Sequence, residues 1–234
     1  PPVQVACPTE SVLRIRELQG SHELPSHLQR GEARRRHGEL DVNRYFDILE
    51  HVRMEPGYVL DYVYRYDPYG GRPFLYARRS ESRPLEDFSA YSEMTDPLDS
   101  GDGTAWLDHV RADGSSESYV ELVVLRLMAE QFYLFWHSLV DDVTPVCDRK
   151  TVEYVLKASG ISQEDADSLR AATLQLELAP TVEIGDEQVQ VSVVAFSKSR
   201  GFARLTYPIR REAPHTFGRG IAERLVEYDS GIVY

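Results

Sequence analysis

Three side chains that could do acid–base or metal chemistry recur at helical spacing in the most apolar long stretch of the chain. Glu130, His137 and Asp141 stand at relative positions 0, 7 and 11 of this stretch, which runs from residue 119 to 142. On a helix these positions share one face, and a histidine beside two carboxylates can bind a divalent metal or act in acid–base catalysis. The three residues are therefore the candidate catalytic site of an enzyme with an atypical carboxylate and histidine arrangement.

The same three positions have a plainer interpretation. They lack the HExxH and ExxH spacings of helical metal sites, and they face solvent if the apolar side of the helix faces a core. The chain also has no Gly-x-Ser-x-Gly elbow, no phosphate-binding glycine-rich loop and no cysteine in a catalytic signature. Clustered acids at 96–103 do not match the spacing of an EF-hand loop, which favours a turn that caps a helix. We predict no bound metal and no cofactor.

A basic and aromatic octapeptide, RGFARLTY, occupies residues 200 to 207. It resembles the conserved octamer of the RNA-recognition-motif family, which reads basic, Gly, aromatic, small, aromatic, aliphatic, any, aromatic. The resemblance covers about residues 150–234 and implies a βαββαβ order in which Val152 to Leu156 is a strand. It also implies that Phe202 stacks on a base of single-stranded RNA and that Arg200 meets phosphate.

Read from its own pattern, the same region has a different interpretation. Residues 151–158 then form a helix, and Phe202 is a core residue beside a turn at Gly201. Arg204 stands where the family carries a second stacking ring. Single-stranded RNA binding through the 200–207 strand is therefore the second alternative function.

Two further groups of side chains could contact a ligand or partner. One is a stripe of tyrosines along a predicted strand, which could stack on a sugar or a base, or could simply pack in a core as strand residues do. The other is a run of three consecutive arginines, which could bind phosphate or an acidic partner, or could be a solvated charge run. The residues concerned are Tyr62, Tyr64 and Tyr66 in the first group and Arg34, Arg35 and Arg36 in the second.

Hydrophobic periodicity predicts the element that carries the candidate catalytic residues. Apolar side chains recur with a period of 3.6 over the stretch that contains them, which indicates a long central amphipathic helix at about 118–142. Pro145 ends it, because the residue before a proline avoids the helical region. Glu121, Arg126 and Glu130 interrupt the stretch, and their charges exclude a membrane span.

Strand patterns flank this helix on both sides in the sequence. Alternation predicts an antiparallel hairpin at 57–79 and a meander of strands at 181–209. The remaining segments predict short peripheral helices, including one at 221–228. The expected fold class is α+β, in a single domain at 1–234 with an N-terminal helical arm at about 9–40 and a possible subdivision near 146–150.

Charge limits the partners that the chain can take. The net charge is −12 over 234 residues, and residues 84–142 hold 13 Asp and Glu against two Arg. Residues 196–224 hold seven Lys and Arg against two Glu, so one segment is locally basic. Because phosphate contacts need clustered cations, nucleic acid and an anionic membrane are not the expected partners.

Two cysteines, Cys7 and Cys147, are too few for a disulfide scaffold. A bridge between them is possible, but two reduced thiols in a cytoplasmic protein is the favoured interpretation. The chain begins with two prolines, so we expect a processed N-terminus, and a removed signal peptide stays open.

Strong core patterning without a catalytic signature favours a non-enzymatic interaction or binding protein. Its partner could be a protein, met through the acidic block at 84–142, the tyrosine hairpin or the arginine run. An enzyme with the carboxylate and histidine site is the first alternative. The oligomeric state has no signal in the sequence.

Overall fold

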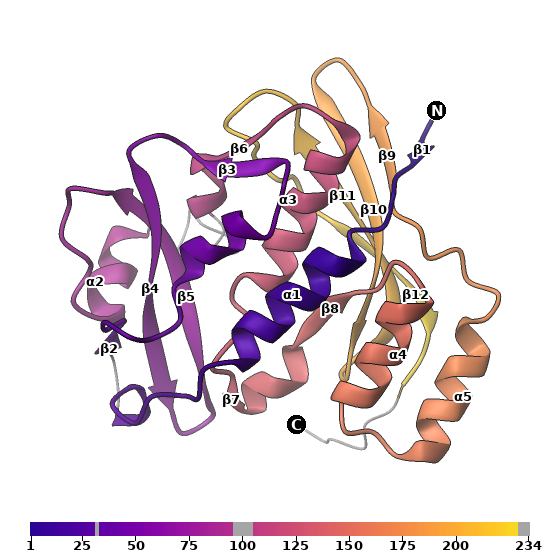
Figure 1. Cartoon of the computed structure of the whole chain (residues 1–234), viewed down its shortest axis with the longest axis horizontal. Helices are drawn as coiled ribbons and strands as arrows, with labels where there is room; N and C mark the ends of the chain where they lie inside the picture. The colour runs from indigo at the N-terminus through magenta and orange to yellow at the C-terminus, as the bar shows by residue number, and fades with distance from the viewer. Residues whose placement is uncertain (31–32, 96–104, 229–234) are drawn as a thin grey trace.

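The computed structural model of the chain describes residues 1–30, 33–95 and 105–228 (Figure 1). Mixed helices and antiparallel sheets confirm the predicted α+β class. The helical elements are α1 (Thr9–Gly20), η1 (Leu28–Arg30), η2 (Val42–Asp47), α2 (Phe88–Met94), η3 (Ala105–His109), α3 (Ser116–Met128), η4 (His137–Asp141), α4 (Arg149–Ala158) and α5 (Gln163–Thr173). The strands are β1 (Val3–Gln4), β2 (Ala33–Arg34), β3 (Val52–Met54), β4 (Tyr58–Asp67), β5 (Gly70–Arg79), β6 (Val110–Ala112), β7 (Phe135–Trp136), β8 (Val143–Pro145), β9 (Thr181–Ile184), β10 (Gln188–Ser197), β11 (Gly201–Arg210) and β12 (Ile221–Val226).

The larger sheet has the strand order β1-β9-β10-β11-β12, and β8 also pairs with β10. Along β10, Val189, Val191 and Val193 belong to the main core. Val194 and Phe196 belong to a second core that α4 and α5 close from the other face. Because side chains alternate along a strand, a single strand can supply both cores. Figure 1 shows α3 on one side of this sheet and α4 and α5 on the other.

The predicted hairpin at 57–79 is confirmed as β4 and β5. The two strands pair antiparallel from Tyr58 opposite Arg79 to Asp67 opposite Gly70. β2 and β7 flank them and complete the order β2-β4-β5-β7. One face of this smaller sheet joins the main core, and Val63 on the other face packs with α2.

The predicted long helix at 118–142 is not supported, because α3 ends at Met128. Its last carbonyls receive side-chain donors from distant parts of the chain: Gln19 Nε2 donates to Met128 O at 2.6 Å, and Tyr45 Oη to Ala129 O at 3.1 Å. Carbonyls at a helix end have no partner within the helix, so these tertiary contacts satisfy the termination. The chain beyond it turns twice through left-handed backbone, at Tyr133 (φ 53°) and Trp136 (φ 52°).

Helix α3 is also not amphipathic in the predicted sense. Side chains on all its faces from Ser118 to Leu125 are buried, between the larger sheet and the β3–β6 pair. Even Glu121 is only 4% exposed, and its carboxylate accepts the backbone N–H groups of Glu50 at 3.0 Å and His51 at 2.7 Å. A buried carboxylate needs such partners, because an unpaired charge in the core would be strongly destabilising.

The helix interpretation of 151–158 is confirmed as α4, and both α4 and α5 begin at a local cap. The Asp148 side chain accepts the Thr151 N–H within a capping box, and the Ser162 hydroxyl accepts the Asp165 N–H. Each cap satisfies an amide that the first turn of a helix leaves without an intrahelical partner.

The predicted helix at 221–228 is wrong, because residues 221–226 form β12 beside β11. Pairing with an existing sheet edge outweighs the local helical pattern. The order of the last elements is thus α4, α5, β9, β10, β11, β12, and Val152 to Leu156 lie in α4. The βαββαβ order that the RNA-recognition-motif resemblance implies is not formed. The acidic segment 96–103 lies outside the described residues.

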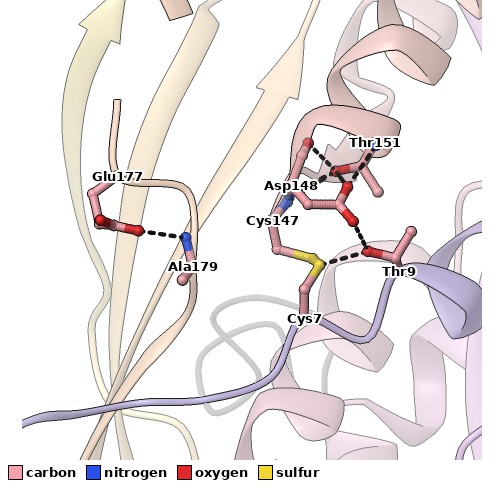
Figure 2. The surroundings of a disulfide bond; sticks show 7 residues. All are labelled: Cys7, Thr9, Cys147, Asp148, Thr151, Glu177 and Ala179. Atoms are coloured by element: carbon pink, nitrogen blue, oxygen red, sulfur yellow. Dashed lines mark hydrogen bonds between the residues drawn. A yellow bond between two sulfur atoms is a disulfide. The ribbon is translucent and has the colours of Figure 1, made fainter. Parts of the chain in front are cut away.

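A disulfide joins Cys7 to Cys147, contrary to the expected reduced thiols (Figure 2). The two Cα atoms are 5.4 Å apart and 140 positions apart in the sequence. The bridge brings the start of α1 against the start of α4, where the Thr9 hydroxyl also donates to Asp148. In the described ranges no helix combines the length and apolar character needed to cross a bilayer.

Candidate functional site

A groove of about 460 Å³ opens where α1, the segment 131–144, α4 and the end of β10 meet. Arg16 and Gln19 line it from α1, Tyr154 and Val155 from α4, and Phe196 from β10. Small-molecule sites usually have volumes of roughly 300–1,000 Å³ and combine apolar walls with a few placed polar groups. The groove has that size and that mixture.

Arg16 fixes one wall of the groove. Its guanidinium donates to Asp142 Oδ1 at 2.5 Å, to Thr144 Oγ1 at 2.6 Å and to Val143 O at 2.8 Å. It also donates to Gln131 O at 3.3 Å, although its side chain is only 7% exposed. The planar fork of arginine suits such convergent acceptors. One side chain of α1 therefore holds both ends of the segment 131–144.

One exposed apolar side chain lines the groove: Leu139 is 51% exposed. Phe135 and Trp136, which are 36% and 56% exposed, form β7 and pair with β5 instead. The left-handed backbone at Tyr133 is held by hydrogen bonds, since its carbonyl accepts from the Tyr64 hydroxyl at 2.7 Å. Non-glycine residues keep such a conformation only where the surrounding structure imposes it.

Charged and polar groups converge on the groove from three elements. The Tyr154 phenol is a neutral hydrogen-bond donor at neutral pH, as tyrosine ordinarily is, and burial raises its pKa further. Lys198 lines the groove from the turn between β10 and β11, and His22 lines it from the turn after α1. Among the described residues Lys198 has no ion-pair partner.

The structure does not place the predicted catalytic residues on one helical face. Glu130 follows the end of α3 and binds away from the groove, with Oε1 accepting the Leu75 N–H at 2.9 Å and Oε2 accepting Arg72 at 3.2 Å. His137 lies in η4 with its ring 4.2 Å from the Trp136 ring. Asp141 is in the same turn, and its side chain is outside the described structure. The described residues contain no cluster of three or more His, Cys, Asp or Glu suited to a metal ion.

The tyrosine stripe faces the protein interior. Tyr62 and Tyr64 are fully buried, and Tyr66 is partly buried against the same core. Burial raises the pKa of Tyr62 and of Tyr64. Their rings contact other aromatic side chains, as Tyr62 does with Phe132 at 5.0 Å, and these two rings are not open to a ligand.

The three consecutive arginines do not act as one patch. Arg34 pairs with Glu86 at 2.9 Å and Arg35 with Asp41 at 3.3 Å. Arg36 is exposed, and its backbone N–H donates to Glu39. Two of the three charges are thus neutralised within the chain.

Phe202 and Arg200, the two candidate RNA contacts of the octapeptide, lie in different environments. Phe202 is fully buried and packs on Phe196 with ring centroids 4.9 Å apart, so its ring is a core residue. Arg200 is exposed in the turn before β11. A base could not stack on Phe202 without opening the second core.

Arg16, Gln19, Tyr154 and Lys198 are site residues that the sequence reasoning missed. Arg16 did carry a signal. Val12, Ile15, Arg16 and Gln19 stand at i, i+3, i+4 and i+7 of α1, so two polar side chains lie in the buried stripe of the helix. A charged residue in such a stripe needs internal partners.

A scan against protein-family models finds no match, and searches of characterised proteins and of solved structures find none either. The assignment of the groove therefore depends on its geometry.

Proposed function

We propose that the protein is a non-enzymatic binding protein and that the groove between α1, the segment 131–144, α4 and β10 is its ligand site. The observation that carries the proposal is the groove itself, about 460 Å³ in volume and lined from four separate parts of the chain. A well-formed pocket of this size with a few convergent polar groups is the default position for a small ligand.

The hydrogen bonding of the polar groups supports binding rather than catalysis. Both terminal nitrogens of the Arg16 guanidinium donate to neighbouring acceptors, and Asp142 is paired with it at 2.5 Å. General acids and bases need a titratable group within reach of substrate. Glu130, one of the two carboxylate candidates from the sequence, is instead bound to Leu75 and Arg72 outside the groove.

The proposal is tested with N-phenyl-1-naphthylamine, a neutral dye whose fluorescence rises in apolar surroundings. We expect saturable binding at one site, weakened about fivefold by Leu139→Ser, because the ligand would cover that half-exposed side chain. Leu174→Ser is the matched control, since Leu174 is 60% exposed at the end of α5 and does not line the groove. Absence of saturable binding, or equal weakening by both substitutions, would contradict the proposal.

A protein partner is the second candidate, favoured by one observation. Trp136 is 56% exposed although its backbone is held at a φ of 52°, and exposed tryptophans are frequent anchors of protein interfaces. The partner that can be tested directly is a second copy of the chain. Trp106→Phe leaves Trp136 as the single tryptophan, and a concentration-dependent blue shift of its emission, matched by sedimentation, would support self-association. Unchanged emission and a single monomer peak would exclude a second copy of the chain as that partner.

We also propose an oxidising compartment in place of the cytoplasm. The cytoplasmic expectation depended on two reduced cysteines, whereas disulfides persist mainly in oxidising environments. Alkylation of intact cells followed by mass spectrometry should find Cys7 and Cys147 unmodified and linked. Alkylation of both thiols would restore the cytoplasmic interpretation.

A further inference from the structure

We infer that the groove selects a small organic anion, with an apolar body and one acidic head group that Lys198 receives. The inference rests on the proposed function, because it names the chemical class of ligand for the same groove. It follows from the charges and the apolar side chains that line this groove, whereas the proposed function was argued from the volume of the groove.

The groove is locally cationic in an acidic protein. Asp142 is the one carboxylate among the described residues that line it, and Arg16 already neutralises that carboxylate at 2.5 Å. Lys198 then remains as a cation without an ion-pair partner in the described part of the chain. The chain as a whole has a net charge of −12, so this local excess is not a consequence of composition.

The turn that holds Lys198 adds to this local charge. Arg200 is exposed in the same turn, which is closed by the Arg200 N–H donating to Ser197 O at 3.3 Å. Gly201 follows with φ 70°, and an added Cβ there would meet Val226 O at 2.2 Å, so the turn is fixed against β12. Two cations on a fixed turn beside an apolar groove attract an anion through the local field.

The rest of the lining suits an apolar body. Leu134 and Leu139 line the groove with accessible aliphatic surface, and the nearly buried Val155 and Phe196 also line it. The Tyr154 phenol, which is protonated at neutral pH as tyrosines ordinarily are, adds one neutral donor. A fully hydrated inorganic anion would leave this apolar surface uncovered, whereas an aryl or acyl anion would bury it.

The test compares two dyes that differ in one group. 1-Anilinonaphthalene-8-sulfonate carries the same ring system as N-phenyl-1-naphthylamine plus one sulfonate. We expect the anionic dye to bind about tenfold more tightly at low salt, because a charge-assisted contact with Lys198 is added. We expect Lys198→Ala to weaken binding of the anionic dye far more than binding of the neutral dye, so that the difference between the two dyes is lost. Lys198→Arg should retain the difference.

Lys157→Ala is the matched control, because Lys157 is an exposed cation on α4 that does not line the groove. It should leave both affinities unchanged, and circular dichroism melting should show that each variant is folded. Equal affinity for both dyes in the wild type, or equal effects of Lys198→Ala and Lys157→Ala, would overturn the inference and leave the proposed function standing. Saturable binding of neither dye would overturn the proposed function itself.

Discussion

The start of α4 and the end of α3 are built in opposite ways. The start of α4 is capped by its own sequence, since Asp148 accepts the Thr151 N–H three residues on. The end of α3 is completed by side chains more than 80 residues away, with Gln19 and Tyr45 binding the Met128 and Ala129 carbonyls. Local caps make one helix predictable from the sequence, and tertiary caps make the other unpredictable.

The difference between local and tertiary caps also predicts which substitutions affect the groove and which affect stability alone. The segment 131–144 depends for its position on Arg16 and on the left-handed residues Tyr133 and Trp136. A segment positioned by distant contacts can be shifted by changing those contacts alone, whereas a locally capped helix keeps its start. We therefore expect changes that break the tertiary contacts to alter the groove first, and changes in the local caps to alter stability only.

The largest expected effect comes from Arg16→Met. Methionine keeps the length of the buried side chain but leaves the Gln131 and Val143 carbonyls without their donor. We expect the free energy of unfolding to fall by about 4 kcal/mol and dye binding to be lost. Urea denaturation and dye titration measure the two effects.

Arg14→Met is the control for this substitution, because Arg14 is exposed on the same helix. It should change the free energy of unfolding by less than about 0.5 kcal/mol. Similar losses from Arg14→Met and Arg16→Met would contradict a special role for the Arg16 contacts.

Removal of the disulfide should have the next largest effect, because the bridge links the locally capped helix to α1. The double variant Cys7→Ser, Cys147→Ser frees a loop of 140 positions. We expect a loss of about 3 kcal/mol of unfolding free energy by urea denaturation. Reductant should destabilise the wild type by the same amount and have no effect on the double variant; a wild type indifferent to reductant would show that the bridge contributes nothing.

Substitutions of the helix caps should reduce the free energy of unfolding by smaller amounts, and they compare a purely local cap with one that also has a tertiary contact. Ser162→Ala removes a purely local cap of α5 and should cost about 1 kcal/mol. Asp148→Ala should cost about 2 kcal/mol, because Asp148 also accepts the Thr9 hydroxyl across the chain. Urea denaturation of both variants, with Thr9→Val added to each, should show coupling to Asp148 and none to Ser162. Equal losses of unfolding free energy from Ser162→Ala and Asp148→Ala, with no coupling of either to Thr9→Val, would contradict a contribution from the Thr9–Asp148 contact.

The smallest effect is a pH dependence at the opposite end of α3. The hydrogen bond between His51 Nδ1 and Asp113 Oδ2, 2.8 Å long, raises the pKa of His51 against the opposing effect of its partial burial. The stabilisation is therefore present below the ordinary histidine pKa of about 6.5 and is lost as pH rises through the raised value.

NMR titration of the His51 ring should give a pKa above about 6.5 in the wild type and a value nearer to it in Asp113→Asn. The urea midpoint of the wild type should fall slightly between pH 6 and 8.5, and that of Asp113→Asn should fall less. A His51 pKa at or below the ordinary histidine value in the wild type would contradict the stabilising hydrogen bond between His51 and Asp113.

The elements that the sequence predicts well are those specified within a few residues. The hairpin of β4 and β5 follows from alternation and from the Asp67 to Gly71 turn, and α4 follows from Asp148 and its apolar period. In contrast, residues 221–226 carry a helical pattern but extend along β11. The neighbouring sheet edge decides their conformation, and no window of local sequence contains that edge.

The candidate site shows the same division more sharply. Glu130 and His137 share a face only if the helix continues past Met128. The helix ends there, and the Gln19 side chain donates to the Met128 carbonyl. Lys198 has no signal in the sequence as a ligand residue, since it lies in a polar turn. Arg16 alone carried one, as a charge in the apolar stripe of α1.

The sequence by itself determined the α+β class, the hairpin of β4 and β5 and the starts of α4 and α5, because alternation, period and caps act between residues close along the chain. The tertiary structure alone decided where α3 ends, that Cys7 meets Cys147, and which side chains surround the groove. Those outcomes depend on donors and acceptors far apart in the sequence, and only the folded chain brings them within hydrogen-bond distance.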